Sequence, residues 1–261
     1  GGDNLFLASI LAIEPATGKL RWHYQTTPAE IWDFTCTSTM TLADLQVNGT
    51  PRKVLMTAPK NGFFYVLDRI TGALISAENF VPVNWATGID LATGRPILTE
   101  DAWYKDEPKI IFPGPAGGHN WHPMSYSPLT GLAYIPSMHL PFYFESVKSF
   151  TYNRDDNTGM ALYYPRSEPL ENTRGEVLKE EAFLLAWDPL QQKEVWRVKM
   201  NAVDFPAGVL STASNLIFEG TLNGYFVVYD AKTGQKLKEI ETGTGIIAAP
   251  VTYEVDGEQY V

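Results

Sequence analysis

A short phrase recurs five times along this chain, and its wording and spacing constrain the fold more than any other feature. Most copies contain a small or aliphatic residue, an acidic residue two positions later, a Thr-Gly turn, and then a Trp or an aliphatic residue. The copies are Ala12–Trp22, Val66–Leu74, Ala186–Trp196 and Val228–Leu237, with a looser copy at Tyr126–Tyr134. An acidic cap before a glycine that can adopt positive φ is typical of a β-hairpin. We expect the following aromatic residue to pack between neighbouring sheets.

The turn positions of these copies are spaced like the blades of a β-propeller. They are Gly18, Gly72, Gly131, Gln192 and Gly234, which lie 54, 59, 61 and 42 residues apart. Periods of this size are typical of four-stranded blades with loop insertions. Short β-rich runs bounded by Gly, Pro, Asn and Asp lie between them, and no window has a clean helical periodicity. The sequence predicts an all-β chain of about four to five blades, part of a larger ring and truncated at both ends.

Two irregular stretches interrupt this period. The first runs from Asn84 to Asn120 and contains a second small turn and a segment rich in Pro and Gly, and the second runs from Pro141 to Arg174. Long loops on one face of a rigid scaffold are where binding and catalytic sites are commonly built. Two interpretations stay open: these stretches contribute to a site, or they are solvent-exposed loops without a role in one.

Charge and cysteine content exclude several classes of function. The chain has 30 acidic and 20 basic residues, for a net charge of −10, so we expect no nucleic-acid partner. No apolar run approaches the roughly 18 residues that a membrane span requires. Cys36 is the only cysteine, which rules out an internal disulfide, a four-cysteine zinc site and a Cys-x-x-Cys-His haem motif within these residues.

Several motifs, in a fixed order, indicate a family. They are Gly2–Phe6, Trp22–Pro28 followed by Trp32-Asp33, Lys60–Tyr65, Gly118–Pro123, Gly208–Thr212 and the closing Pro250–Val261. With these motifs the chain resembles the quinoprotein alcohol dehydrogenases, eight-bladed propellers that bind pyrroloquinoline quinone (PQQ) and usually calcium. The repeated phrase is similar to that family's tryptophan-docking motif, with its Trp at Trp22 and Trp196. The resemblance implies that residues 1–261 are the C-terminal portion of such a propeller.

The resemblance also assigns residues to chemistry. Asp33 matches the family's catalytic base and would lie at the metal, and Lys60 matches the cation that contacts the quinone oxygens. Asn120 matches an asparagine that reaches the cofactor, with Trp121 beside it. Phe205 stands where the family usually has a cofactor-contacting Trp. Oxidation of an alcohol needs a carboxylate to take the hydroxyl proton beside an electrophilic quinone, and this residue set meets that need.

Two positions refine these expectations. Thr35 stands where lanthanide-using members have a second Asp, so calcium is the expected metal. Phe205-Pro206 replaces the family's Trp-Asn, which removes an indole N–H, a side-chain amide and a backbone donor. The affinity for PQQ is therefore open. The family's remaining metal ligands and its adjacent-cysteine disulfide would lie in the preceding half of the ring.

The resemblance implies a periplasmic enzyme that oxidises an alcohol, which we expect to be a primary one, to the aldehyde. Electrons would pass to an external acceptor such as a cytochrome c. Two alternatives remain. A non-catalytic propeller could use the same repeats for protein binding, and a related PQQ enzyme could act on an unusual substrate. The joint presence of Asp33, Lys60 and Asn120 favours an enzyme.

Overall fold

The computed structural model describes residues 2–152, 154, 160–163, 170–171, 177–178, 180–200 and 205–261. Within these ranges the chain is built from β-strands, with one 3-10 segment, η1 (Glu100–Ala102). The prediction of an all-β chain is therefore confirmed. Within the same ranges, no helix is long and apolar enough to cross a lipid bilayer.

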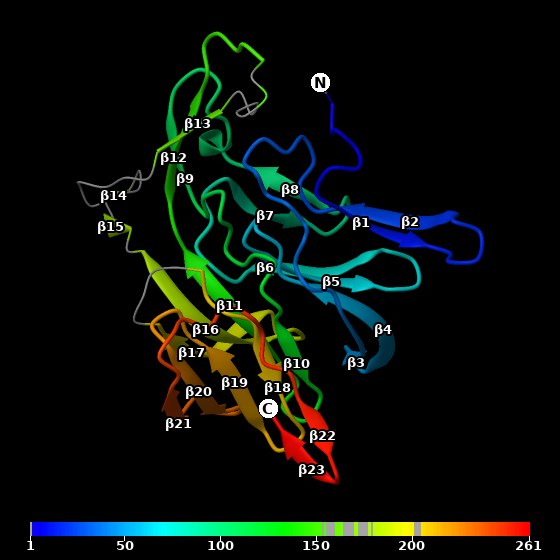
Figure 1. Cartoon of the computed structure of the whole chain (residues 1–261). Helices are drawn as coiled ribbons and strands as arrows, with labels where there is room; N and C mark the ends of the chain where they lie inside the picture. The colour runs from blue at the N-terminus through cyan, green and yellow to red at the C-terminus, as the bar shows by residue number, and fades with distance from the viewer. Residues whose placement is uncertain are drawn as a thin grey trace.

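Three four-stranded antiparallel sheets form the body of the molecule (Figure 1). The first comprises β3 (Thr41–Val47), β4 (Thr50–Thr57), β5 (Phe63–Asp68) and β6 (Leu74–Asn79). The second comprises β10 (Ser125–Ser127), β11 (Leu132–His139), β16 (Glu181–Asp188) and β17 (Lys193–Lys199). The third comprises β18 (Val209–Ser211), β19 (Leu216–Gly220), β20 (Tyr225–Asp230) and β21 (Lys236–Glu241). Within each sheet the strands follow chain order, as in propeller blades.

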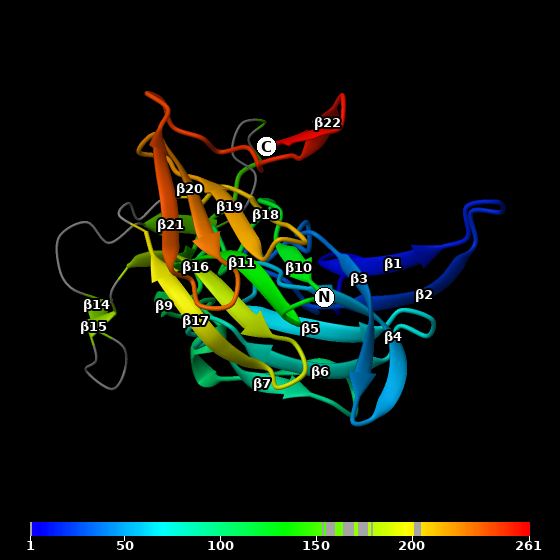
Figure 2. The same ribbon diagram turned by 90° about the horizontal axis from the view of Figure 1, so that it is seen from below.

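A two-stranded hairpin precedes the first sheet and another follows the third. They are β1 (Ser9–Ile13) with β2 (Leu20–Gln25), and β22 (Tyr253–Val255) with β23 (Glu258–Tyr260). Figure 2 shows the sheets fanned around the molecule in chain order, from the blue hairpin to the red one. The described chain therefore holds three complete blades and a hairpin at each end, and the sheets do not close into a ring.

The hairpin turns have the geometry that the repeated phrase predicts. All five turn positions have positive φ, including Gln192, which replaces the glycine at φ 52°. The side chains of Asp68, Asp188 and Asp230 each accept two backbone N–H bonds from the turn that follows. Such caps satisfy turn donors that no strand can pair. Glu14 differs, because its carboxylate pairs with Arg21 instead.

The two tryptophans of the phrase dock onto the turn of the next blade. Trp22 Nε1 donates to the Arg69 carbonyl at 3.2 Å, and a Cβ added to Gly72 would lie 2.6 Å from the Trp22 ring. Trp196 repeats this arrangement on Ala231 and Gly234, with distances of 3.2 and 2.7 Å. Glycine is required at both turns, because any side chain would overlap the indole. The prediction that these aromatics pack between neighbouring sheets is confirmed.

Separate hydrophobic cores lie between consecutive sheets. Val54, Met56 and Phe64 of the first sheet pack against Ile135 and Leu185 of the second. Leu184 and Ala186 of the second sheet pack in turn against Ile217 and Val227 of the third. Central strands are thus covered on both faces, which explains why β11 is buried at every position.

The two irregular stretches form small elements on one side of the blades. The first contains η1 and the strands β7 (Ala86–Asp90), β8 (Arg95–Leu98) and β9 (Lys109–Ile111). β9 pairs with β12 (Phe142–Ser146), which pairs with β13 (Met160–Tyr163). A further pair comprises β14 (Leu170–Glu171) and β15 (Val177–Leu178). Much of the stretch from Pro141 to Arg174 lies outside the described residues.

Candidate functional site

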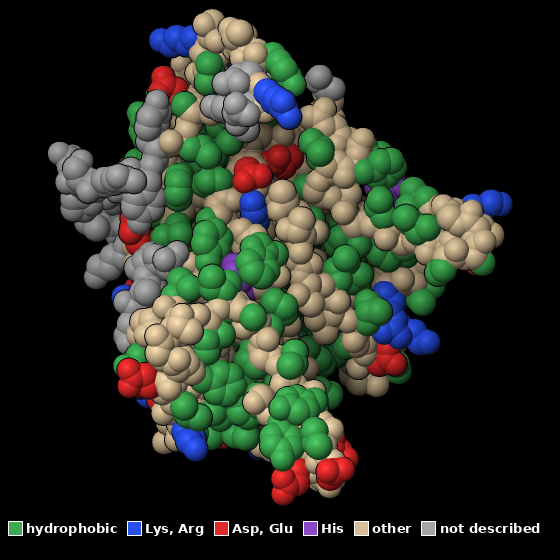
Figure 3. All heavy atoms as spheres, viewed as in Figure 1, with side chains coloured by type: hydrophobic (Ala, Val, Ile, Leu, Met, Phe, Trp, Pro, Cys, Tyr) green, Lys and Arg blue, Asp and Glu red, His purple; other side chains and the backbone are tan. Residues whose placement is uncertain are grey.

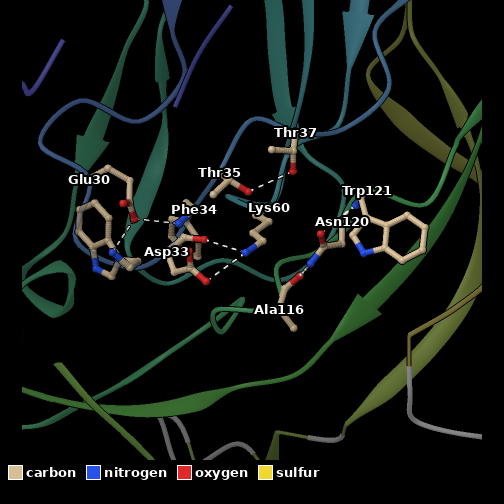
Figure 4. A network of polar contacts seen from close by, with 10 residues as sticks. Glu30, Asp33, Phe34, Thr35, Thr37, Lys60, Ala116, Asn120 and Trp121 are labelled. Atoms are coloured by element: carbon tan, nitrogen blue, oxygen red, sulfur yellow. Dashed lines mark hydrogen bonds and ion pairs between the residues drawn. The ribbon is translucent and has the colours of Figure 1, made fainter. Parts of the chain in front are cut away.

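Asp33 lies in an irregular loop between β2 and β3, with a backbone conformation that is rare for its residue type. Its φ is +64°, in the left-handed region that only Gly adopts freely. The backbone N–H groups on either side, of Trp32 and Phe34, donate to one oxygen of Glu30 at 2.6 and 2.7 Å. The loop thereby directs the Asp33 side chain outward, where it is 53% exposed (Figure 4).

Lys60 reaches Asp33 from the turn between β4 and β5. Its Nζ lies 3.1 Å from Asp33 Oδ2 and 3.1 Å from the Asp33 carbonyl oxygen. The Lys60 side chain is only 10% exposed, so its charge lies mostly under the surface while the carboxylate faces outward. Two of the three ammonium hydrogens are used in these bonds, which leaves one donor for another acceptor.

The neighbour of Lys60 fixes this turn to the start of the Asp33 loop. Asn61 Nδ2 lies 3.2 Å from the Thr26 carbonyl, 3.2 Å from Thr27 Oγ1 and 2.8 Å from the Tyr65 hydroxyl. Burial raises the pKa of Tyr65 well above its ordinary value, so the hydroxyl stays protonated. This buried network sets the distance between the two loops that carry Asp33 and Lys60.

A glycine-rich loop packs against Lys60 from the other side. The Gly118 N–H donates to the Lys60 carbonyl at 2.9 Å. At Gly117, with φ +85°, an added Cβ would lie 2.5 Å from Lys60 Cγ and 2.6 Å from its Cα. Only glycine therefore allows this approach, which brings Asn120 to the same region (Figure 4). Asn120 donates to the Ala116 carbonyl and accepts from the Trp121 N–H, each at 2.8 Å.

His119 links the glycine-rich loop to the segment that precedes Lys60. Its ring is fully buried, with Nδ1 2.7 Å from the Ala58 carbonyl oxygen and Nε2 2.6 Å from that of His122. Desolvation lowers its pKa, against the opposing effect of the two carbonyls. Because Ala58 lies two residues before Lys60, His119 ties the two segments of the site together.

A row of aromatic rings extends the site toward the third blade. Trp121 is 54% exposed and stacks on His122 with ring centroids 3.9 Å apart, and Phe205 lies 5.7 Å from His122 on its other side. Burial, and to a lesser degree His119, lowers the pKa of His122 to about 4. The five residues that the sequence singles out thus lie along one line of contacts, from Asp33 through Lys60 and the 116–122 loop to Phe205.

One face of the molecule carries few charged side chains near its middle (Figure 3). On the face shown in Figure 3, most basic and acidic side chains lie at the rim, and a small group lies near the middle among hydrophobic ones. A cavity of about 350 Å³ adjoins the far end of the row, between β17 and the third sheet, and Phe205 and Pro206 line it. Asp33 and Lys60 are not among its lining residues.

The metal assignment at Asp33 can be compared with the donors present. Among the residues that the structure describes, no three His, Cys, Asp or Glu side chains gather in a way that could hold an ion. Calcium takes six to eight oxygen ligands. A calcium ion at Asp33 would therefore need oxygen ligands from groups other than such a cluster.

Three contributors to this geometry were not predicted from the sequence. Glu30 supports the backbone on both sides of Asp33, Gly117 admits Lys60, and His119 links their loops. The available signal is position: Glu30 and Gly117 lie beside motifs, and His119 lies inside Gly118–Pro123. Their roles depend on loop contacts that spacing does not reveal.

Comparison with known proteins gives the site its context. The family model "Glucose/ethanol/alcohol dehydrogenase, beta-propeller domain", labelled PQQ, matches residues 1–105 and 185–261. The chain is 50% identical to quinohemoprotein alcohol dehydrogenase ADH IIB of Pseudomonas putida, covering 100% of this chain and 37% of that protein. It is 49% identical to the 1-butanol dehydrogenase (cytochrome c) of Thauera butanivorans, covering 100% and 38%.

A solved structure agrees with these relatives. The crystal structure of quinohemoprotein alcohol dehydrogenase from Comamonas testosteroni superposes with a TM-score of 0.90 at 47% identity, covering 99% of this chain and 38% of that one. The chain spans somewhat more than a third of the length of the proteins it matches. The three sheets are accordingly consecutive blades of a partial propeller, and the chain belongs to the family of PQQ-containing alcohol dehydrogenases.

Proposed function

We propose that the protein containing this chain oxidises an alcohol to the aldehyde with PQQ as its redox cofactor. The observation that carries this proposal is the pairing of Lys60 Nζ with Asp33 Oδ2 at 3.1 Å, with the cation nearly buried and the carboxylate half exposed. A carboxylate at an open surface can receive a substrate proton, and a desolvated cation beside it can stabilise negative charge. The family supplies the identity of the cofactor.

The groups of this chain have distinct tasks in the proposed reaction. When bound, PQQ supplies the electrophilic quinone that accepts the hydride from the carbinol carbon. Asp33 takes the hydroxyl proton of the alcohol at a carboxylate oxygen. Lys60 orients Asp33 through two hydrogen bonds and has one N–H left for a cofactor oxygen. Trp121 and Phe205 offer exposed aromatic surface along the row of rings that leads from the 116–122 loop.

Calcium is the proposed metal, with Asp33 as one of its ligands. Thr35 follows Asp33 at the position where a second Asp would add a hard anionic ligand, and its hydroxyl lies 3.2 Å from that of Thr37. Because the Thr35 and Thr37 hydroxyls add no negative charge, they suit a divalent ion better than a trivalent one. Calcium should restore turnover to the metal-free protein, whereas restoration by lanthanum alone would overturn this assignment.

The wider setting of the reaction is also proposed from the relatives. The Thauera relative is named as a dehydrogenase that uses cytochrome c. We propose a primary alcohol as substrate, an external acceptor such as a cytochrome c, and a periplasmic location.

A direct test separates this function from a non-catalytic scaffold. PQQ and calcium are added to the complete polypeptide that contains these 261 residues, and the absorbance of the bound quinone and the turnover of a primary alcohol are recorded. An enzyme binds PQQ stoichiometrically and reduces it when alcohol is added. A scaffold shows neither response, and that result would refute the proposed function.

A further inference from the structure

Glu30 makes an unusual pair of contacts beside Asp33. A single oxygen, Oε1, accepts the backbone N–H of Trp32 at 2.6 Å and that of Phe34 at 2.7 Å. Neither N–H belongs to a strand, because the segment between β2 and β3 is irregular. Two backbone N–H groups that are separated by one residue and converge on one anion form a backbone nest. Here the anion is a side chain of the same loop.

The residue enclosed by this nest is under conformational strain. Asp33 has φ +64°, and a non-glycine residue held in that region costs roughly 1–3 kcal/mol unless the surroundings enforce it. The carboxylate of Glu30 supplies that enforcement, because its two hydrogen bonds require the Trp32 and Phe34 amides to point the same way. Charge-assisted bonds of this kind are stronger than neutral ones.

Two further hydrogen bonds connect the same loop to the segment that contains Ala102 and Tyr104. The hydroxyl of Tyr104 donates to the Ile31 carbonyl, and Trp32 Nε1 donates to the Ala102 carbonyl at 2.8 Å. Burial, and then the nearby charge of Glu30, raises the pKa of Tyr104 to about 12, so this donor stays protonated. The loop is therefore anchored at Ile31 and Trp32, while Glu30 holds the two amides that flank Asp33.

We infer that Glu30 is a positioning residue for the reaction: it holds the strained backbone of Asp33 so that the Asp33 carboxylate stays beside Lys60 and faces outward. This inference rests on the proposed role of Asp33 as the base. Glu30 contacts backbone amides, and its effect passes through Asp33. Because the bonds go to one oxygen, an amide oxygen in the same place can replace it, whereas removal of the side chain cannot be compensated.

The test compares Glu30→Ala and Glu30→Gln in the complete polypeptide, with exposed Glu241→Ala as the matched control. Hydrogen exchange at the Trp32 and Phe34 amides reports the nest without any cofactor. In Glu30→Ala these amides should exchange about ten-fold faster or more. In the PQQ-loaded protein, kcat for alcohol oxidation should fall roughly 10- to 100-fold with little change in KM, because a small displacement of a catalytic group is costly. Glu30→Gln should retain most of both properties.

Several results would overturn the inference. Unchanged amide exchange or a wild-type kcat in Glu30→Ala would do so, and so would a Glu30→Gln protein as impaired as Glu30→Ala. Glu30→Asp serves if Glu30→Ala does not fold, because it keeps the carboxylate but withdraws it by one methylene; unchanged kcat in that variant contradicts the inference. The exchange measurement stands even if the proposed function fails, so the two failures can be told apart.

Discussion

At the residue scale, the site depends on a few contacts between segments that are distant in sequence. Asp33 and Lys60 lie 27 positions apart, and Lys60 meets the glycine-rich loop at Gly117. Each contact has a narrow steric or electrostatic requirement. The positions of Asp33 and Lys60 therefore depend on neighbouring residues, such as Gly117, that take no part in the proposed reaction.

Substitution of Gly117 by Ala tests the steric requirement. The added methyl would lie 2.6 Å from Lys60 Cα, a backbone-linked atom that cannot move aside easily, and the residue would keep φ +85°. We expect a loss of about 1–3 kcal/mol in the free energy of unfolding, together with reduced alcohol turnover. Gly243→Ala is the control, because it has φ +72° and no atom within 4 Å of the added methyl. Equal losses in the two variants would mean that contact with Lys60 is unimportant.

His122 gives the site a pH dependence whose sign is fixed. Its folded-state pKa of about 4 lies below the ordinary histidine value of 6.5. As pH falls from 6.5 toward 4, His122 becomes protonated in the unfolded chain but stays neutral in the folded chain. The free energy of unfolding should therefore decrease over this interval. His122→Phe keeps the stack with Trp121 and should flatten this dependence in urea unfolding. The exposed His23→Phe should not, and an unchanged slope in His122→Phe would contradict the assignment.

The sequence predicted the reacting groups of the site better than their supports. Asp33, Lys60, Asn120 and Trp121 lie in motifs, and the structure brings them to one region. Glu30 was not predicted, because its role arises only when the backbone at Asp33 adopts positive φ. His119 lies in a motif but received no predicted role, and its ring nitrogens lie 2.7 and 2.6 Å from two carbonyl oxygens. Such roles follow from loop conformation, which local sequence patterns do not encode.

At the element scale, the blades are joined by the docking of a tryptophan onto the next hairpin turn. This arrangement was predictable, because the acidic cap, the turn glycine and the tryptophan are local in sequence. Positive φ at Gln192 shows that the turn persists where the Thr-Gly pair is lost. The loop elements β7 to β9 and β12 could not be predicted in the same way, since β9 pairs with β12 across the start of the second blade.

Replacement of Trp196 by Phe measures one docking contact. The variant loses the hydrogen bond from Nε1 to the Ala231 carbonyl and part of the packing on Gly234. We expect the free energy of unfolding to fall by about 1 kcal/mol or somewhat more, measured by urea denaturation. Leu129→Ala, at an exposed position in another hairpin turn, should change it little. Similar effects of the two substitutions would show that docking contributes nothing specific.

At the scale of the whole molecule, three complete blades carry the residues of the candidate site. The chain offers the proposed base, a cation and an aromatic row, and it covers somewhat more than a third of the length of its relatives. Its net charge of −10 suits a soluble partner with a basic surface better than an anionic polymer. The departure at Phe205-Pro206 is accommodated by contact of the Phe205 ring with His122, so an aromatic surface is kept there.

In the proposed PQQ-dependent oxidation, Asp33 accepts the proton of the alcohol. The most direct measurement is alcohol turnover by Asp33→Asn in the complete polypeptide, with bound PQQ quantified in the same sample. The amide keeps the size of the side chain and can no longer act as a base. We expect PQQ to be retained and kcat to fall by roughly 10²- to 10⁴-fold. Near-normal turnover with PQQ bound would contradict this role of Asp33.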